Sequence, residues 1–415
     1  MNHDRQFMKR AVLLIGVVLA LTTLSRLIRA DTGSCSGGML TLPFTDVPAN
    51  NLFFCAIAEA YFTGLTNGTS ATTYVPDQNV PREQMAAFIT RTLDQSLKRG
   101  SRRAALGQWW RPTSSGTLRP VEFASTPAWI VCDGTDLWVT FPTGDSVVRI
   151  EASSGRVEQT WTGFAPATPG RIIAAAGRIF IVAQNGIAPG SIYVINPEAT
   201  VPGNATVFEN SIGSLPGAVT FDGTYLWTAN AGSGFPGTPG ISRIRVSDAL
   251  DNSFTAGFSF PRSIFWDGAA LWVLDQGPDP DDDALKEVNP STGEVIAVIP
   301  VPEGLREMIF DGTNLWISNF TGGSITVVRA VGSLKGTVLQ TVTGNGLNGC
   351  TGMAFDGERV LVTNTTGNSV SLFKAADFTP LGSLSTGGAT APRSVCSDGV
   401  NFWIVRADSN DMVRF

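Results

Sequence analysis

From residue 129 onward, short apolar runs alternate with glycine-containing turns in a unit that recurs seven times. Each unit has an apolar run, a turn that is usually Asp-Gly, and a second apolar run that usually begins Leu-Trp. Glycine accepts the positive φ of a tight turn and aspartate hydrogen-bonds its backbone, so each turn predicts a β-hairpin. The turn glycines, separated by 43, 46, 45, 44, 45 and 42 residues, are Gly134, Gly177, Gly223, Gly268, Gly312, Gly357 and Gly399.

This spacing leaves room for two more strands in each unit. Residues 146–150 and 324–328 are examples of a third strand, and residues 294–298 are an example of a fourth. Four antiparallel strands repeated at this period are typical of the blades of a β-propeller. We therefore expect a mainly β fold in which residues 117–415 form a seven-bladed β-propeller with four-stranded antiparallel blades.

The seventh unit contains only three strands, because the sequence ends in its third one at 412–415. We expect residues 117–123 to supply the fourth strand of the last blade and so close the ring, which removes exposed sheet edges. The large aromatic side chains after the turns are expected to fill the space between blades rather than to bind a ligand. They are Trp138, Phe180, Trp227, Trp272, Trp316 and Trp403.

Short motifs carry a resemblance to known repeats. Residues 228–230 (Thr-Ala-Asn), Ser318-Asn319 and residues 363–370 are similar to the YVTN-type and NHL-type propeller repeats of secreted bacterial proteins. The resemblance implies the fold rather than an activity, because propellers serve as binding proteins, scaffolds and several kinds of enzyme.

Residues 31–97 have a different character. Phe-Thr-Asp-Val at 44–47, Gly-Leu-Thr-Asn-Gly at 64–68 and Pro-Arg-Glu-Gln-Met-Ala at 81–86 resemble, in this order, the motifs of a single S-layer homology repeat. We expect a small helical segment with one helix near 54–62 and another opening near 81. The resemblance implies binding of cell-wall polysaccharide or another envelope component through Arg82 and Glu83; the alternative is a purely structural cap.

Residues 1–30 have the arrangement of a signal peptide, with basic side chains, an apolar stretch at 11–24 and the small residue Ala30. Arg26 and Arg29 crowd the cleavage region, so an uncleaved membrane anchor is the alternative. Either way we expect an exported protein, at the surface of the cell envelope or outside the cell, that meets a membrane only through this segment.

The charge balance bears on the partners. Residues 1–30 carry five basic side chains and one acidic one, which leaves 24 basic against 34 acidic side chains in the rest of the chain. A surplus of about ten negative charges argues against a nucleic-acid partner. The basic connector at 98–116, which contains Trp109-Trp110, either turns its charges to water or contacts an acidic envelope polymer or lipid headgroups.

None of the five cysteines belongs to a Cys-x-x-Cys motif, which argues against a zinc site. In an oxidising compartment the predicted pairs are Cys35 with Cys55 and Cys132 with Cys396, with Cys350 unpaired. Cys132 and Cys396 are expected at the junction of the first and last blades, where two buried free thiols are the alternative to a closing disulfide.

The only histidine is His3, within the predicted leader, so the remaining chain has no imidazole for catalysis or metal binding. We therefore expect binding or display rather than catalysis. The alternative is a propeller enzyme, either of the lyase type or a carboxylate-based glycosidase. Streptogramin-type lyases, by resemblance, depend on a histidine base and magnesium, and Glu307 or Asp275 would be the first carboxylates to test for the glycosidase.

Four arginines share one position in the repeat. In a propeller, the loops that lead into the innermost strands meet at one mouth of the central channel. The residues six positions before the turn glycines are Ala128, Arg171, Gly217, Arg262, Arg306, Thr351 and Arg393. Guanidinium groups at a channel mouth suit the carboxylate, sulfate or phosphate groups of an anionic ligand, either a protein or a glycan. The alternative is that each arginine pairs with a nearby acid such as Glu307 or Asp275.

Two further groups of polar residues are candidates. Asn230, Asp275, Asn319 and Asn364 lie seven residues after their turn glycines and are expected to join the site at the mouth. No cofactor is expected otherwise, but Asp279, Asp281 and Asp283 form an oxygen-rich loop that is a weak candidate for calcium. A solvated acidic loop is the alternative, because the order of the ligands in a known calcium loop is missing.

Overall fold

The computed structural model describes residues 32–35, 38–62, 66, 68–80, 85, 120–152, 154–186, 188–198, 203–232, 238–247, 251–399 and 401–415. They belong to two compact units, one up to residue 85 and one from residue 120. The predicted signal peptide, Arg82, Glu83 and the basic connector lie outside the described residues. No helix of the described part is long and apolar enough to cross a membrane.

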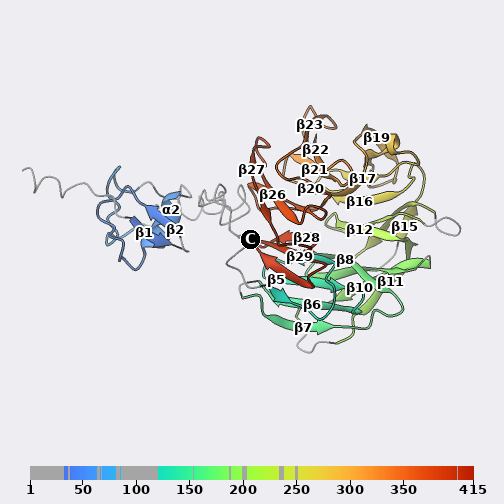
Figure 1. Cartoon of the computed structure of the whole chain (residues 1–415), viewed down its shortest axis with the longest axis horizontal. Coiled ribbons are helices and arrows are strands. Elements are labelled where there is room, and N and C mark those ends of the chain that lie inside the picture. Colours follow the sequence, from blue (N-terminus) through green and yellow to red (C-terminus); the bar gives the residue numbers. More distant parts are fainter. Residues whose placement is uncertain are drawn as a thin grey trace, which may run out of the picture. The chain divides into compact units, whose positions relative to one another are not determined.

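The larger unit is a seven-bladed β-propeller, as the repeat predicted, and each blade is a four-stranded antiparallel sheet around a common centre (Figure 1). From the innermost strand outward, blade 1 contains β4 (Trp129–Cys132), β5 (Asp136–Phe141), β6 (Ser146–Glu151) and β7 (Val157–Trp161). Blade 2 contains β8 (Thr168–Ala175), β9 (Arg178–Asn185), β10 (Ala188–Ile195) and β11 (Thr206–Ser214). Blade 3 contains β12 (Pro216–Phe221), β13 (Tyr225–Asn230), β14 (Gly240–Arg245) and β15 (Asp251–Phe254).

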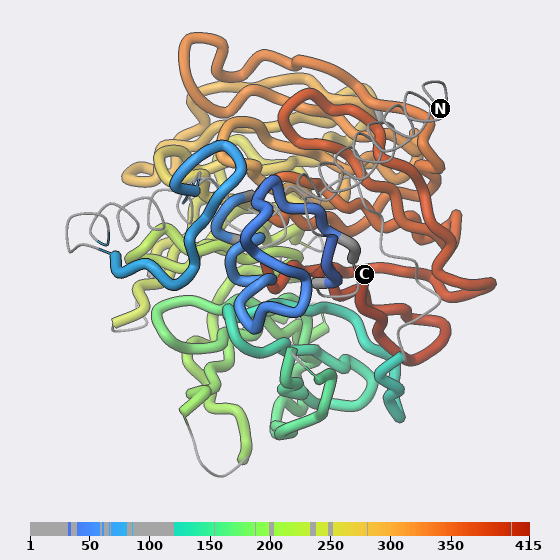
Figure 2. The backbone as a smooth tube through the Cα atoms, turned by 90° about the vertical axis from the view of Figure 1, so that its left-hand side faces the viewer, coloured from blue at the N-terminus to red at the C-terminus, as the bar shows by residue number. Residues whose placement is uncertain are grey.

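The remaining blades repeat this order, and each is a continuous stretch of chain except the last (Figure 2). Blade 4 contains β16 (Pro261–Trp266), β17 (Leu271–Asp275), β18 (Ala284–Val288) and β19 (Val295–Pro300), with the 3-10 helix η2 (Pro280–Asp282) after β17. Blade 5 contains β20 (Leu305–Phe310), β21 (Asn314–Asn319), β22 (Ser324–Arg329) and β23 (Val338–Val342). Blade 6 contains β24 (Cys350–Phe355), β25 (Arg359–Asn364), β26 (Ser369–Lys374) and β27 (Pro380–Ser385). Blade 7 contains β28 (Pro392–Ser397), β29 (Phe402–Arg406), β30 (Asp411–Arg414) and β3 (Val121–Glu122).

The turn between the first two strands links the hairpin to the core. All seven turn glycines have φ between 70° and 102°, a region that other residues rarely adopt. In blade 5, Asp311 Oδ1 accepts the backbone N–H groups of Thr313 and Asn314, and its Oδ2 accepts the indole N–H of Trp316 at 2.7 Å. Four more blades repeat this indole bond at 2.7 or 2.8 Å, between Asp133 and Trp138, Asp222 and Trp227, Asp267 and Trp272, and Asp398 and Trp403.

The side chains after the turns form the core between the blades, as predicted. Trp138, Phe180, Trp227, Trp272 and Trp316 have no exposed surface, and Trp403 is 3% exposed. The aspartate of the turn satisfies the one polar atom of each buried indole, which would otherwise weaken the apolar core. These side chains therefore belong to the architecture and are not available to a ligand.

The ring closes where the sequence predicted. Val121 pairs with Met412 and Glu122 with Asp411, so β3 is the outermost strand of blade 7. The backbone N–H of Phe123 also bonds the carbonyl of Asn410 at 2.8 Å. Val121 and Phe123 pack against a buried cluster that contains Met412 and joins blade 7 to blade 1. The closing strand is thus both hydrogen-bonded and packed.

Cys132 and Cys396 meet at this junction without forming a disulfide. Both belong to the cluster between blades 7 and 1, as their alternation predicted, but both are free thiols, as is Cys350. The predicted Cys132–Cys396 bond is therefore wrong for this structure, in which the thiols pack as small apolar side chains. Cys55 is disulfide-bonded.

Burial protects these thiols and gives the protein an alkaline limit. Burial raises the pKa of Cys350 to about 12, and it also raises the pKa of Cys396 and of Cys132. Unfolded thiols ionise near pH ~8.5, so above that pH the native chain holds more protons than the unfolded chain and stability falls as pH rises. We expect slow labelling of the native thiols at pH 8 and a free energy of unfolding that decreases above pH ~9. Labelling as fast as in denaturant would contradict this, and Cys350→Ala should flatten the pH dependence.

The smaller unit has its own core. Strands β1 (Thr32–Cys35) and β2 (Gly38–Thr41) form an antiparallel hairpin, and helix α2 (Phe54–Phe62) occupies the range predicted for the first helix. The carboxylate of Asp46 accepts the backbone N–H groups of Tyr74 and Val75 at 2.9 and 2.7 Å. This contact joins the motif at 44–47 to residues 74–75, and Phe44 and Val47 of that motif belong to the buried core of the unit.

Candidate functional site

The seven residues that lie six positions before the turn glycines line one cavity at the propeller axis; Ala128 directly precedes β4, and the other six lie within the innermost strands of their blades. This cavity, which we call the mouth cavity, has a volume of about 630 Å³. Its lining includes Ala128, Arg171, Gly217, Arg262, Arg306, Thr351 and Arg393. The structure thus brings all four predicted arginines to one place, although they come from blades 2, 4, 5 and 7. A concave site with convergent polar groups is the usual form of a ligand site.

Three of the arginines stack on aromatic rings of the lining. The guanidinium carbon of Arg171 lies 3.6 Å from the ring centre of Trp129, that of Arg262 lies 4.3 Å from Phe260, and that of Arg306 lies 4.7 Å from Phe320. Stacking holds a guanidinium by its face and leaves the N–H donors in its plane for an acceptor. The rings therefore orient the arginines without consuming their hydrogen bonds.

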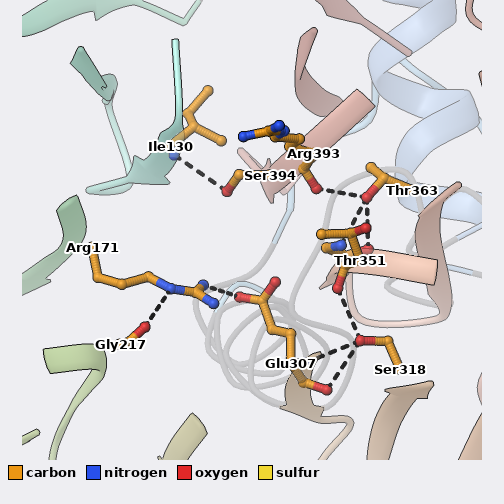
Figure 3. A network of polar contacts seen from close by, with 10 residues as sticks. Ile130, Arg171, Gly217, Glu307, Ser318, Thr351, Thr363, Arg393 and Ser394 are labelled. Carbon is orange, nitrogen blue, oxygen red and sulfur yellow. Dashed lines mark hydrogen bonds and ion pairs between the residues drawn. The ribbon is translucent and has the colours of Figure 1, made fainter. Parts of the chain in front are cut away.

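One ion pair crosses the mouth. Arg171 Nη1 of blade 2 donates to Glu307 Oε1 of blade 5 at 2.5 Å, while Arg171 Nε donates to the carbonyl of Gly217 at 2.9 Å (Figure 3). Glu307 is the one carboxylate among the described residues that line the mouth cavity. Four guanidinium groups therefore face a single acid, which leaves a surplus of three positive charges.

In the part of the chain that the structure describes, no acid forms an ion pair with the other three arginines. Arg262 Nε donates to the neutral amide oxygen of Gln276 at 3.0 Å. Among the described residues, no side chain accepts a hydrogen bond from the guanidinium of Arg306 or Arg393, and both side chains are exposed. Burial and the charge of Arg306 lower the pKa of Arg262, and Asp283 opposes this only in part. Like charges are thus held close together at a place open to solvent.

Hydrogen bonds between neighbouring blades fix the position of the backbone around the mouth cavity. Ser318 Oγ donates to the carbonyl of Thr351 at 2.9 Å, and Thr363 Oγ1 donates to the carbonyl of Arg393 at 2.6 Å (Figure 3). Across the closure, the backbone N–H of Ile130 donates to Ser394 Oγ at 3.3 Å. The backbone that carries the arginines is therefore tied from blade to blade, which favours a preformed site.

The second predicted group does not belong to the mouth cavity. Asn230, Asp275, Asn319 and Asn364 are at most 2% exposed, and none of them lines the cavity. Asn319 Nδ2, for example, donates to Ser324 and Thr326, and Asp275 binds Lys286 and the backbone N–H groups of Ser259 and Phe260. Because neighbouring blades cover both faces of these strands, the polar side chains turn inward and cap the strand ends. Their predicted role at the mouth is wrong.

The predicted calcium loop does not assemble. Asp283 is 1% exposed, and its two oxygens accept the backbone N–H groups of Gly277 and Gly304. Asp279 and Asp281 are exposed. The described part of the chain contains no cluster of three or more acidic, histidine or cysteine side chains suited to a metal ion.

The sequence reasoning missed the aromatic partners and Gln276. The sequence did indicate two of these residues. Trp129 directly follows Ala128 and Phe260 lies two residues before Arg262, and both Ala128 and Arg262 lie six positions before a turn glycine. Phe320 and Gln276 each come directly after a second strand, where the loop returns to the mouth.

Comparison with known proteins supports the fold. No family model matches the chain, and no curated protein matches it in sequence. Among solved structures, it is similar to a streptogramin B lyase, with TM-score 0.57 and 16% identity over 72% of this chain and 96% of that chain. It is also similar to Kuenenia stuttgartiensis hydrazine synthase, with TM-score 0.59 and 16% identity over 71% and 97% of the two chains. The β-propeller domain of Myceliophteria thermophila Cps50 (Swd1) gives TM-score 0.55 and 10% identity over 72% and 99%. At such identities these similarities show a propeller fold and not an activity.

Proposed function

We propose that this protein is a binding protein whose mouth cavity holds an anionic group, with an acidic glycan as the ligand class. The observation that carries the proposal is the set of four arginines around one cavity with a single, already paired carboxylate. Exposed arginines without an acid suit a carboxylate, sulfate or phosphate, which a guanidinium binds through two parallel hydrogen bonds. The aromatic and proline side chains of the lining suit the apolar face of a sugar ring.

We further propose export and display at the cell envelope, with cell-wall polysaccharide as a second partner of the S-layer-homology-like segment. This rests on the signal-peptide arrangement of residues 1–30, on the ordered motifs of 31–97, and on the YVTN-type and NHL-type motifs of the propeller. Cell fractionation, with and without Arg82→Ala, tests it. Recovery of the protein in the cytoplasm would contradict export, and unchanged envelope attachment of the variant would contradict the role of Arg82.

A binding role accounts for the cavity better than the enzymatic alternative does. Carboxylate-based hydrolysis of glycosides uses two acidic groups on either side of the scissile bond. The described lining supplies Glu307 alone, and this side chain is held by Arg171. The lyase similarity reaches only the fold, and the sequence has no histidine beyond His3.

The direct test is calorimetric titration with glucuronic acid, with glucose as the neutral control, at low and high NaCl. We expect glucuronic acid to bind, glucose not to bind, and the affinity to fall as salt screens the arginines. Equal affinities for both sugars, or no binding of either, would refute the proposal.

Replacing Glu307 tests the charge argument in the opposite direction. Glu307→Gln removes the carboxylate of the described lining and frees Arg171, so we expect affinity for glucuronic acid to rise about tenfold, which corresponds to about 1.4 kcal/mol. Glu303→Gln, at an exposed acid that does not line the cavity, is the matched control. A weaker affinity in Glu307→Gln would instead show that the glutamate contacts the ligand.

A further inference from the structure

A second, smaller cavity adjoins the mouth cavity over blade 4. Its volume is about 280 Å³, and Phe260 and Arg262 line both cavities. Its other lining residues are Ser259, Gln276, Gly277 and Pro278. A ligand anchored at Arg262 therefore has room to continue outward past Phe260 and over the loop that follows β17.

The charge reverses along this route. Among the described residues that line the second cavity, Arg262 is the one ionisable side chain, and the loop that borders the cavity carries the exposed acids Asp279, Asp281 and Asp282. Asp282 lies directly against the lining, because a Cβ placed on Gly277 would come within 2.1 Å of its Cβ. An extended ligand that occupies both cavities therefore has positive side chains around its end in the mouth cavity and negative side chains near its part in the second cavity.

The lining of the second cavity suits a neutral, hydroxylated group. Pro278 and the ring of Phe260 offer apolar surface to the C–H face of a sugar. Gln276 uses its amide oxygen for Arg262, which leaves the N–H donors of the amide for a hydroxyl. The exposed carboxylates of the bordering loop lie outside the lining but would repel a second anion.

We propose that the ligand carries its anionic group at one end, in the mouth cavity, and that an uncharged sugar follows it in the second cavity. This inference rests on the proposed function and narrows it from acidic glycans in general to glycans with a terminal acid. A uniformly charged polyuronate fits the mouth with its end residue, but its second carboxylate meets the acidic loop.

The test compares four probes by calorimetry: glucuronic acid, a disaccharide of terminal glucuronic acid and neutral xylose, galacturonic acid, and trigalacturonic acid. We expect the disaccharide to bind about tenfold more tightly than glucuronic acid, through hydrogen bonds from the Gln276 amide and contact with Phe260 and Pro278. Trigalacturonic acid should bind no more tightly than galacturonic acid. Equal affinity of the disaccharide and glucuronic acid overturns this inference and leaves the proposed function standing. Failure of every acid to bind refutes the proposed function itself.

A variant in which the acidic loop after β17 is neutralised provides a second test of this inference. In Asp281→Asn with Asp282→Asn we expect trigalacturonic acid to gain affinity about tenfold while galacturonic acid is unchanged. Asp408→Asn, at an exposed acid in the equivalent loop of blade 7, is the matched control and should change neither. Trigalacturonic acid that binds the double variant and the native protein equally well overturns the role of the acidic loop and with it the inference.

Discussion

Replacing Arg306 and Arg393 together with alanine should abolish measurable affinity for glucuronic acid, with a loss of at least a hundredfold. Each substitution removes an unpaired guanidinium from the mouth cavity. A hydrogen bond to a charged group contributes about 1.5–3 kcal/mol, and a tenfold loss of affinity corresponds to about 1.4 kcal/mol, so each substitution should weaken binding at least about tenfold. The single variants and Arg262→Ala should each lose about tenfold. Calorimetry with the same sugar measures the effect.

The same variants should leave the fold intact, which separates binding from stability. Burial and the charge of Arg306 already lower the pKa of Arg262, so removal of Arg306 relieves a repulsion. We expect Arg306→Ala to unfold no earlier than the native protein in denaturant. Arg178→Ala, at an exposed arginine beside the turn of blade 2 and outside the mouth cavity, is the control. If Arg178→Ala weakened binding as much as Arg306→Ala, the effect would come from net charge and not from the mouth.

The second large effect concerns ring closure. Met412 has no exposed surface, pairs with Val121 of the closing strand, and packs in the cluster between blades 7 and 1. Met412→Ala should therefore lower the free energy of unfolding by about 2–5 kcal/mol, through lost burial and the cavity that remains. Denaturant titration followed by tryptophan fluorescence gives this value.

A matched control lies on the outermost strand of an unbroken blade. Val338 of blade 5 is 39% exposed, and Val338→Ala should cost less than about 1 kcal/mol. If both substitutions cost the same, the packing of Met412 between blades 7 and 1 would contribute no more to stability than an exposed side chain does.

The blades were predictable because their determinants are local. An Asp-Gly turn between two apolar runs specifies a hairpin wherever it occurs, and the regular spacing then leaves one arrangement for seven such units. The closing strand followed because the seventh unit lacks a fourth strand. The arginines could be placed for the same reason, since five of the seven innermost strands have six residues and a fixed offset from each turn reaches the same end of every blade.

Features that depend on loops or on exact distances could not be predicted in this way. Phe320 and Gln276 share one position in the repeat, eight residues after their turn glycines, but the kind of residue there changes from blade to blade, so the repeat indicates the position and not the aromatic or amide side chain. The strand-end position of Asn319 was counted correctly, but the burial of both faces of β21, which turns the amide inward, is a property of the assembled ring. Alternation placed Cys132 and Cys396 at one interface, whereas bond formation depends on the separation of the two sulfur atoms.

The closing strand also determines how the propeller would respond to a pulling force. The polypeptide that leads to residues 1–119 leaves the propeller from β3, which is held by two residue pairs and the Phe123 bond at the outer edge of blade 7. Tension applied through that leading segment would load these few hydrogen bonds before any other part of the ring. A propeller held by that segment would then begin to unfold where β3 pairs with β30. The six blades formed from continuous chain would unfold last.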